Sequence, residues 1–128
     1  MEIVNSKFYD SFEGYPEIHF IYETKEQVNR FVIWEGYFET LLSACFSEDI
    51  REGGLLHSYR NADGFYDESP WKIPNIDIAI NELGLFKKTE IQSDSNDMIM
   101  AVENLKSELL SFLTEPQNRG LEVYIDYN

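Results

Sequence analysis

The segment from Tyr59 to Trp71 holds the residues whose types and spacing best suit binding chemistry. It mixes aromatic side chains with carboxylates in a turn-forming stretch that contains Asp63-Gly64 and Ser69-Pro70. Tyr and Trp are favoured interface anchors, because they supply contact area at low entropic cost. Carboxylates beside them can pair with Lys or Arg of a partner. We therefore predict a partner-binding surface formed by Tyr59, Asp63, Tyr66, Asp67, Glu68 and Trp71.

A structural role is the alternative for each aromatic side chain of this segment. Phe65, Tyr66 and Trp71 would then pin a long loop onto the core. For any single aromatic residue this structural reading is favoured, whereas for the loop as a whole we favour a partner surface. Glu35 and Glu39, one helical turn apart, form a second candidate patch for the partner.

Catalytic and metal-binding patterns find little support in the sequence. An EF-hand needs acidic residues at alternating positions and a Glu at position 12, and the spacing in Asp63–Glu68 does not meet this requirement. His19 and His57 have no neighbouring catalytic pattern, and Cys45 stands in an apolar run that predicts a buried thiol. Carboxylate pairs arise by chance among 24 acidic residues. We therefore predict no enzymatic activity, catalytic residue, metal or cofactor.

The net charge is the strongest signal of composition. The chain has 24 Asp and Glu against 10 Lys and Arg, which gives −14 at pH 7. Residues 1–50 carry 10 acidic and 3 basic side chains, residues 51–89 carry 6 and 5, and residues 90–128 carry 8 and 2. Acidic ends flank a nearly balanced, aromatic-rich centre. This distribution predicts a basic partner that is attracted over long range, and it disfavours nucleic acid as a direct ligand.

Length and hydropathy indicate one domain over residues 1–128. A chain of this size can bury a core without disulfides. An aromatic content of 15% argues against disorder. The first residues lack the pattern of a signal peptide, and no apolar run approaches a membrane span. We expect a soluble protein that does not bind membranes and is located in the cytoplasm.

The first half of the chain predicts a strand and a long helix. Residues 17–23 alternate in hydropathy, which is typical of a strand. Thr24 and Gln27 match a capping box, and apolar residues at spacings of three and four then predict a helix from Val28 to Cys45. Residues 47–74 contain many turn signals and predict a long loop with a short strand at Leu55–Tyr59.

The second half predicts two helices and a closing strand. Asn75 can cap a helix over Ile76–Leu83, and a strand is possible over residues 85–91. The cluster around Ser93–Asn96 opens a third helix, which Pro116–Gly120 should end. Residues 121–127 alternate and predict the last strand. The expected fold is therefore α+β, with a small mixed or antiparallel sheet packed with about three helices.

The chain resembles the immunity proteins of bacterial polymorphic toxin systems, including those of contact-dependent growth inhibition. The likeness rests on the acidic stretch Trp34-Glu35-Gly36-Tyr37-Phe38-Glu39, the segment Ser69-Pro70-Trp71-Lys72-Ile73-Pro74 and the overall acidity. The likeness is one of general character over the whole chain, and it contains no diagnostic motif. The resemblance implies that the protein binds a toxin domain, often a basic nuclease, and covers its active site or substrate surface.

Three functions follow from these observations. The first is an immunity protein that neutralises a basic toxin domain, such as a nuclease. The second is an acidic adaptor or regulatory protein, or a nucleic-acid mimic, that binds another basic protein. The third is a small hydrolase that uses two carboxylates, for which a deep pocket with two close carboxylates would be required.

Overall fold

The strand predicted over residues 17–23 lies at the centre of a five-stranded sheet. In the computed structural model, which describes residues 1–128, β2 (Glu17–Glu23) pairs antiparallel with β3 (Val28–Trp34) and with β5 (Tyr124–Tyr127). β1 (Glu2–Phe8) adds parallel to β3, and β4 (Trp71–Lys72) adds antiparallel to β5. The strand order is β1-β3-β2-β5-β4. The sheet is mixed, and the predicted α+β class is confirmed.

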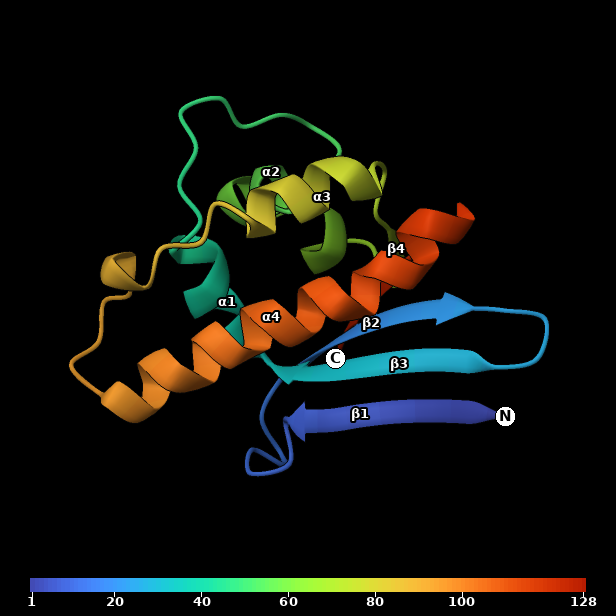
Figure 1. The fold of residues 1–128 in the computed structure, drawn as a ribbon, viewed down its shortest axis with the longest axis horizontal. Coiled ribbons are helices and arrows are strands. Elements are labelled where there is room, and N and C mark those ends of the chain that lie inside the picture. The colour runs from blue at the N-terminus through green and yellow to red at the C-terminus, as the bar shows by residue number, and fades with distance from the viewer.

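The helices gather on one side of this sheet, and α4 (Asn96–Arg119) runs across it (Figure 1). Asn75 caps α3 (Ile76–Leu83) as predicted, because its Oδ1 accepts the N–H groups of Asp77 and Ile78 at 3.0 and 3.2 Å. Ser95 caps α4 by accepting the N–H of Met98. The helical elements are α1 (Glu35–Ser43), α2 (Leu56–Asn61), the 3-10 turn η1 (Gly64–Tyr66), α3 (Ile76–Leu83), the 3-10 turn η2 (Lys88–Glu90) and α4 (Asn96–Arg119).

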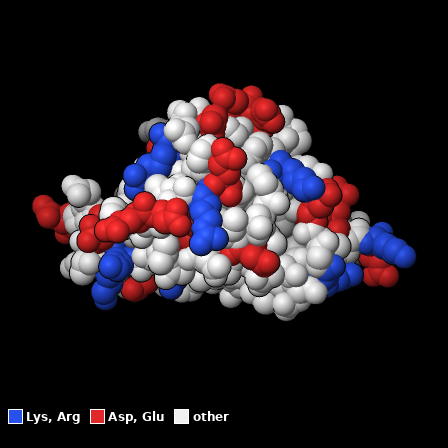
Figure 2. All heavy atoms as spheres, turned by 90° about the horizontal axis from the view of Figure 1, so that it is seen from above, with Lys and Arg blue, Asp and Glu red and all other residues white.

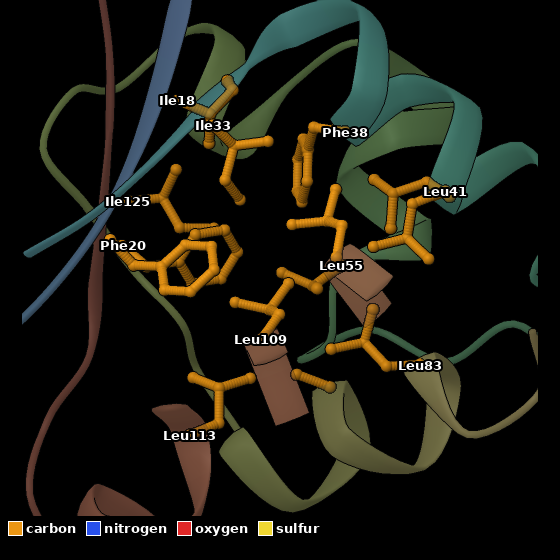
Figure 3. Close-up of a cluster of buried hydrophobic side chains, with 14 of the residues drawn as sticks. Ile18, Phe20, Ile33, Phe38, Leu41, Leu55, Leu83, Leu109, Leu113 and Ile125 are labelled. Atoms are coloured by element: carbon orange, nitrogen blue, oxygen red, sulfur yellow. The ribbon is translucent and has the colours of Figure 1, made fainter. Parts of the chain in front are cut away.

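The hydrophobic core lies between the sheet and the helices. Phe20 of β2 meets Phe38 of α1 edge to face at 5.5 Å between ring centroids, and Phe31 of β3 meets Phe112 of α4 at 5.4 Å. Figure 3 shows side chains of the sheet and of the helices converging in this space, among them Ile18, Ile33, Leu55, Leu83, Leu109 and Ile125. Cys45 is fully buried here, as predicted, and burial raises its thiol pKa to about 12.

The opposite face of the sheet carries polar residues that alternate with the core residues of β2. His19 lies there between Arg30, whose guanidinium is 2.9 Å from Nδ1, and Glu17, which contacts Nε2. Arg30 also reaches Glu2 at 3.6 Å. His19 is therefore tied into a chain of charged groups across three strands.

The prediction of one helix over Val28–Cys45 is wrong for its first half. Residues 28–34 form β3, and only Glu35–Ser43 is helical. Thr24 does not cap a helix: its Oγ1 accepts the N–H of Gln27 at 3.2 Å and so closes the turn between β2 and β3. Only the Thr24 half of the predicted capping box forms, and it serves a hairpin, because the side-chain amide of Gln27 donates to Asn29 instead.

Three further predictions need correction. The segment predicted as a strand at Leu55–Tyr59 is helix α2, and within residues 85–91 only Phe86 makes a bridge, to Cys45. α4, by contrast, ends at Arg119 with Gly120 at its C-cap, within the predicted range Pro116–Gly120. The last strand begins at Tyr124, not at residue 121. β1 and β4 were not predicted. Among the helices, none has the length and apolar character needed to span a membrane.

Candidate functional site

Phe65 fixes the aromatic-rich segment in place. It lies in η1, is fully buried and contacts the rings of Phe38, Tyr66 and Trp71 at 5.7, 4.5 and 5.8 Å between centroids. Gly64 precedes it with a φ of +59°, and a side chain there would overlap with Ser58 of α2. The tight approach of η1 to α2 thus depends on a glycine in the left-handed region.

The segment forms one wall of an open hollow of about 280 Å³, which we call the acidic hollow. Three of the predicted carboxylates, Asp63, Asp67 and Glu68, line it, and Glu52 adds a fourth from the preceding loop. Trp71 contributes an aromatic side chain. The remaining lining residues are Gly53, His57, Ser58, Gly64 and Pro74. No Lys or Arg lines the hollow, so its carboxylates are free to meet a cation from outside.

His57 is the only titratable base at the acidic hollow. Its Nε2 lies 3.8 Å from a carboxylate oxygen of Glu52. The sequence predicted no role for His57, and it did not single out Glu52. Both come to the site only because α2 turns back against η1.

Glu35 and Glu39 join the tyrosines of the segment instead of forming a patch of their own. The hydroxyl of Tyr66 donates to Glu39 Oε2 at 2.7 Å, and the hydroxyl of Tyr127 donates to Glu35. The two tyrosine rings contact each other at 5.5 Å between centroids. We call these four residues together with Tyr59 the Tyr–Glu cluster.

Hydrogen bonding and burial keep the hydroxyls of the Tyr–Glu cluster protonated. The bond to Glu35 is the largest cause that raises the pKa of Tyr127 to about 12. Burial, followed by the bond to Glu39, raises the pKa of Tyr66 further. Burial and the Glu39 charge also raise the pKa of Tyr59. At neutral pH the hydroxyls of Tyr66 and Tyr127 donate to the carboxylates, so part of the charge of Glu35 and Glu39 is already satisfied within the protein.

Three of the predicted aromatic residues therefore divide between two environments. Tyr59 and Tyr66 are half-buried and pack against the core inside the Tyr–Glu cluster. Trp71 is also half-buried, but it lines the acidic hollow. The structure brings Asp63, Asp67, Glu68 and Trp71 together around that hollow.

Glu82 of α3 supports the site and was missed at the sequence level. It is 6% exposed, and its Oε1 accepts the N–H groups of Leu55 and Leu56 at 2.6 and 3.2 Å. These are the free donors at the start of α2, the helix that backs the acidic hollow. A side chain at Gly54 would overlap with the Glu82 carboxylate. The one available signal was a Glu three residues after Ala79, close to the apolar stripe of the helix.

Replacing Glu82 tests this support. Glu82→Leu leaves two buried backbone donors unpaired, and we expect the free energy of unfolding to fall by about 2–3 kcal/mol in urea denaturation. Glu82→Gln keeps an acceptor oxygen and should lose much less. Equal losses of unfolding free energy in the two variants would show that these hydrogen bonds do not account for the stability that buried Glu82 contributes.

The same residue predicts a pH effect of defined sign. Burial raises the pKa of Glu82 above its usual 4.5, so the folded chain binds this proton more readily than the unfolded chain. The resulting stability is fully present below pH 4.5 and is lost as the pH rises through the folded pKa. Wild type should therefore gain stability relative to Glu82→Gln on acidification.

Other hollows indent the surface. The largest, about 730 Å³, lies beside the β2–β3 turn and is lined by residues 23–27, Arg119 and Leu121. No group of three or more His, Cys, Asp or Glu side chains is placed to hold a metal ion.

The distribution of charge over the surface is uneven. Figure 2 shows one face, on which acidic and basic side chains alternate and do not form one continuous patch. The acidic hollow differs from this pattern because no Lys or Arg lines it.

Comparisons with known proteins add no relative to this description. No family model matches the chain, and no curated protein or solved structure matches it either.

Proposed function

We propose that this protein is an immunity protein that binds a basic toxin domain, such as a nuclease, and covers its active site or substrate surface. The observation that carries the proposal is the acidic hollow, where four carboxylates and Trp71 surround an open space that no Lys or Arg lines. The resemblance in sequence style to immunity proteins agrees with it. The encounter would take place in the cytoplasm.

The chemistry of the hollow suits Lys and Arg side chains. A nuclease uses such residues to hold the phosphates of its substrate. Asp63, Asp67 and Glu68 would pair with these cations through charge-assisted hydrogen bonds, while the Trp71 ring offers a face for a guanidinium. An occupied hollow would withdraw from the toxin the groups that bind its substrate. The protein needs no catalysis of its own for this function.

Co-expression with the neighbouring reading frame tests the proposal. Immunity genes lie next to their toxin genes, so we expect the two products to co-purify and the toxic effect of the partner to be suppressed. Co-purification with a basic protein that is not toxic would instead support an adaptor. Unabated toxicity in the presence of the folded protein would contradict the proposal.

The association rate should depend steeply on salt. The chain carries −14, and the Debye length shrinks from about 30 Å at 0.01 M to about 10 Å at 0.1 M ionic strength. We expect the rate of binding to the partner to fall at least ~10-fold over this range in stopped-flow measurements. A rate that stays constant would rule out electrostatic steering.

A further inference from the structure

The strand β1 leaves one edge of the sheet unpaired. It pairs with β3 on one side, and Figure 1 shows it at the rim of the sheet. The carbonyl of Met1 accepts the N–H of Val28 at 2.9 Å, which sets the alternation along the strand. Because backbone groups of successive residues point to opposite sides, those of Glu2 and Val4 point away from β3. They are therefore free to pair with a further strand.

The opposite edge of the sheet is protected against such pairing. β4 is two residues long, and Pro70 and Pro74 lie close to its two ends. Proline has no N–H to donate, so this edge offers little to a further strand. The β1 edge contains no proline, and it exposes Met1, Ile3 and Val4 at 88%, 47% and 49%. Extension of the sheet is therefore favoured at β1.

The β1 edge is locally neutral, although the whole chain carries −14. Residues 3–6 have no charged side chain. Glu2 pairs with Arg30 of β3 at 3.6 Å, and Lys7 pairs with Glu108 of α4 at 2.6 Å. A basic segment would find these carboxylates already paired, whereas the free carboxylates of the acidic hollow lie at the other edge, beside β4. A neutral, apolar strand therefore suits β1 best.

We propose that this strand is β1 of a second copy of the chain, added antiparallel about a two-fold axis at Ile3. The same neutral, apolar strand then meets itself, as a two-fold interface requires. Glu2 of each copy exchanges its backbone hydrogen bonds with Val4 of the other copy. The two Ile3 side chains face each other as a non-hydrogen-bonded pair, in which side chains approach most closely.

The end of β1 determines this register. The carbonyl of Ser6 already accepts the N–H groups of Tyr9 and Asp10 at 2.8 and 3.0 Å, so a register centred further along the strand would lack an acceptor. The two Glu2 side chains become diagonal neighbours, with Cα atoms about 7–8 Å apart. Arg30 of each copy, which contacts its own Glu2, offsets part of their repulsion.

The dimer leaves both acidic hollows accessible. Each hollow lies beside β4, at the far edge of its sheet from the new contact. One continuous sheet thus carries a hollow at each end, and the dimer can hold two partners at once. The contact involves few residues on each side, so it belongs to the small interfaces that dissociate on dilution.

Sedimentation velocity on the protein alone tests the proposal. The 15.0 kDa chain should associate reversibly at about 0.1–1 mM and stop at the dimer, because each copy has one such edge. The association constant should rise at least ~10-fold between about 0.01 M and 0.1 M ionic strength, since salt screens the repulsion between two chains of −14. This salt effect has the opposite sign to that expected for a basic partner.

Val4→Pro removes the pairing without removing a bond within the sheet. The N–H of Val4 points away from β3, and proline is tolerated at such an edge position. The dissociation constant of the dimer should rise at least ~10-fold, because each copy loses a backbone donor. The thermal midpoint measured under dilute, monomeric conditions should stay close to that of wild type. Val4→Thr keeps the N–H and suits a strand, so it should dimerise as wild type does.

Ile3→Lys tests the register independently of proline. It places two cations opposite each other at the two-fold axis, so dimerisation should weaken at least ~10-fold although the net charge of each chain falls. Met100→Lys is the matched control. Met100 is 60% exposed on α4, and its replacement changes the net charge equally, so this variant should dimerise at least as well as wild type.

Three results would overturn this inference. They are a monomer at every concentration and salt, a dimer that weakens as salt is added, and wild-type dimerisation of both Val4→Pro and Ile3→Lys. All of these measurements use the protein without a basic partner, so this inference and the proposed function fail independently.

Discussion

Phe65→Ala is expected to lower the free energy of unfolding by about 3–5 kcal/mol, the largest effect of any single substitution in the loop. Phe65 is fully buried and holds Phe38, Tyr66 and Trp71 together. Its removal leaves a cavity where η1 meets α1. Urea denaturation measures the loss, with the slope of the transition checked for two-state behaviour.

The same substitution should weaken partner binding more than its effect on stability alone explains. Without Phe65, the wall of the acidic hollow formed by Asp63, Asp67 and Trp71 loses its anchor to the core. The affinity should therefore drop under conditions where the variant is still folded. Phe65→Leu, which keeps most of the apolar volume, should recover both properties.

Phe46→Ala provides the matched control. Phe46 is 57% exposed, so its truncation should change the free energy of unfolding by no more than about 0.5 kcal/mol. If Phe65→Ala were as stable as Phe46→Ala, the loop would not depend on its buried ring. In that case the acidic hollow would have to be held by other contacts.

The sequence predicted well those elements whose burial is one-sided. β2 alternates because one face meets the core, and α3 and α4 each bury a single stripe. β3 failed this test because its burial does not alternate throughout: Phe31, Val32 and Ile33 are all buried. A continuous apolar run also contains apolar residues at the spacing of four that is typical of a helix. Only the pairing with β1 and β2 decides that this segment is a strand.

Two other elements were hidden for different reasons. β1 is an edge strand with exposure on both faces, so Glu2–Phe8 shows no clear alternation. α2 begins at Leu56, directly after Leu55, and both residues are fully buried. Glu82, from 26 to 27 residues away, caps this start of the helix. Long-range side-chain caps leave no local pattern.

The candidate site was predictable in composition but not in arrangement. Turn signals and mixed aromatic and acidic residues singled out the segment that lines the acidic hollow. The link between Glu35 and Tyr127 spans 92 residues and could not be read from spacing. Glu35 and Glu39 were predicted as a separate patch, whereas the structure shows them as carboxylates that are hydrogen-bonded within the protein.

The second large effect is expected from reversing the charge of the acidic hollow. Asp67→Lys/Glu68→Lys places two cations where the proposal needs two anions, and the affinity for a basic partner should fall at least ~100-fold, or about 2.7 kcal/mol. Both side chains are exposed, so folding should be nearly unchanged. Titration calorimetry with the co-purified partner measures the loss.

Glu48→Lys/Asp49→Lys distinguishes a local contact from an effect of net charge. These two acidic residues are also adjacent and exposed, lie outside the acidic hollow, and add the same positive charge when replaced. Their variant should slow association, since the long-range attraction weakens equally, but dissociation should stay as in wild type. Asp67→Lys/Glu68→Lys should slow association to a similar extent and also speed dissociation, because close contacts govern the lifetime of the complex. Identical dissociation rates for the two variants would mean that the partner is held elsewhere and that the hollow contributes only its charge.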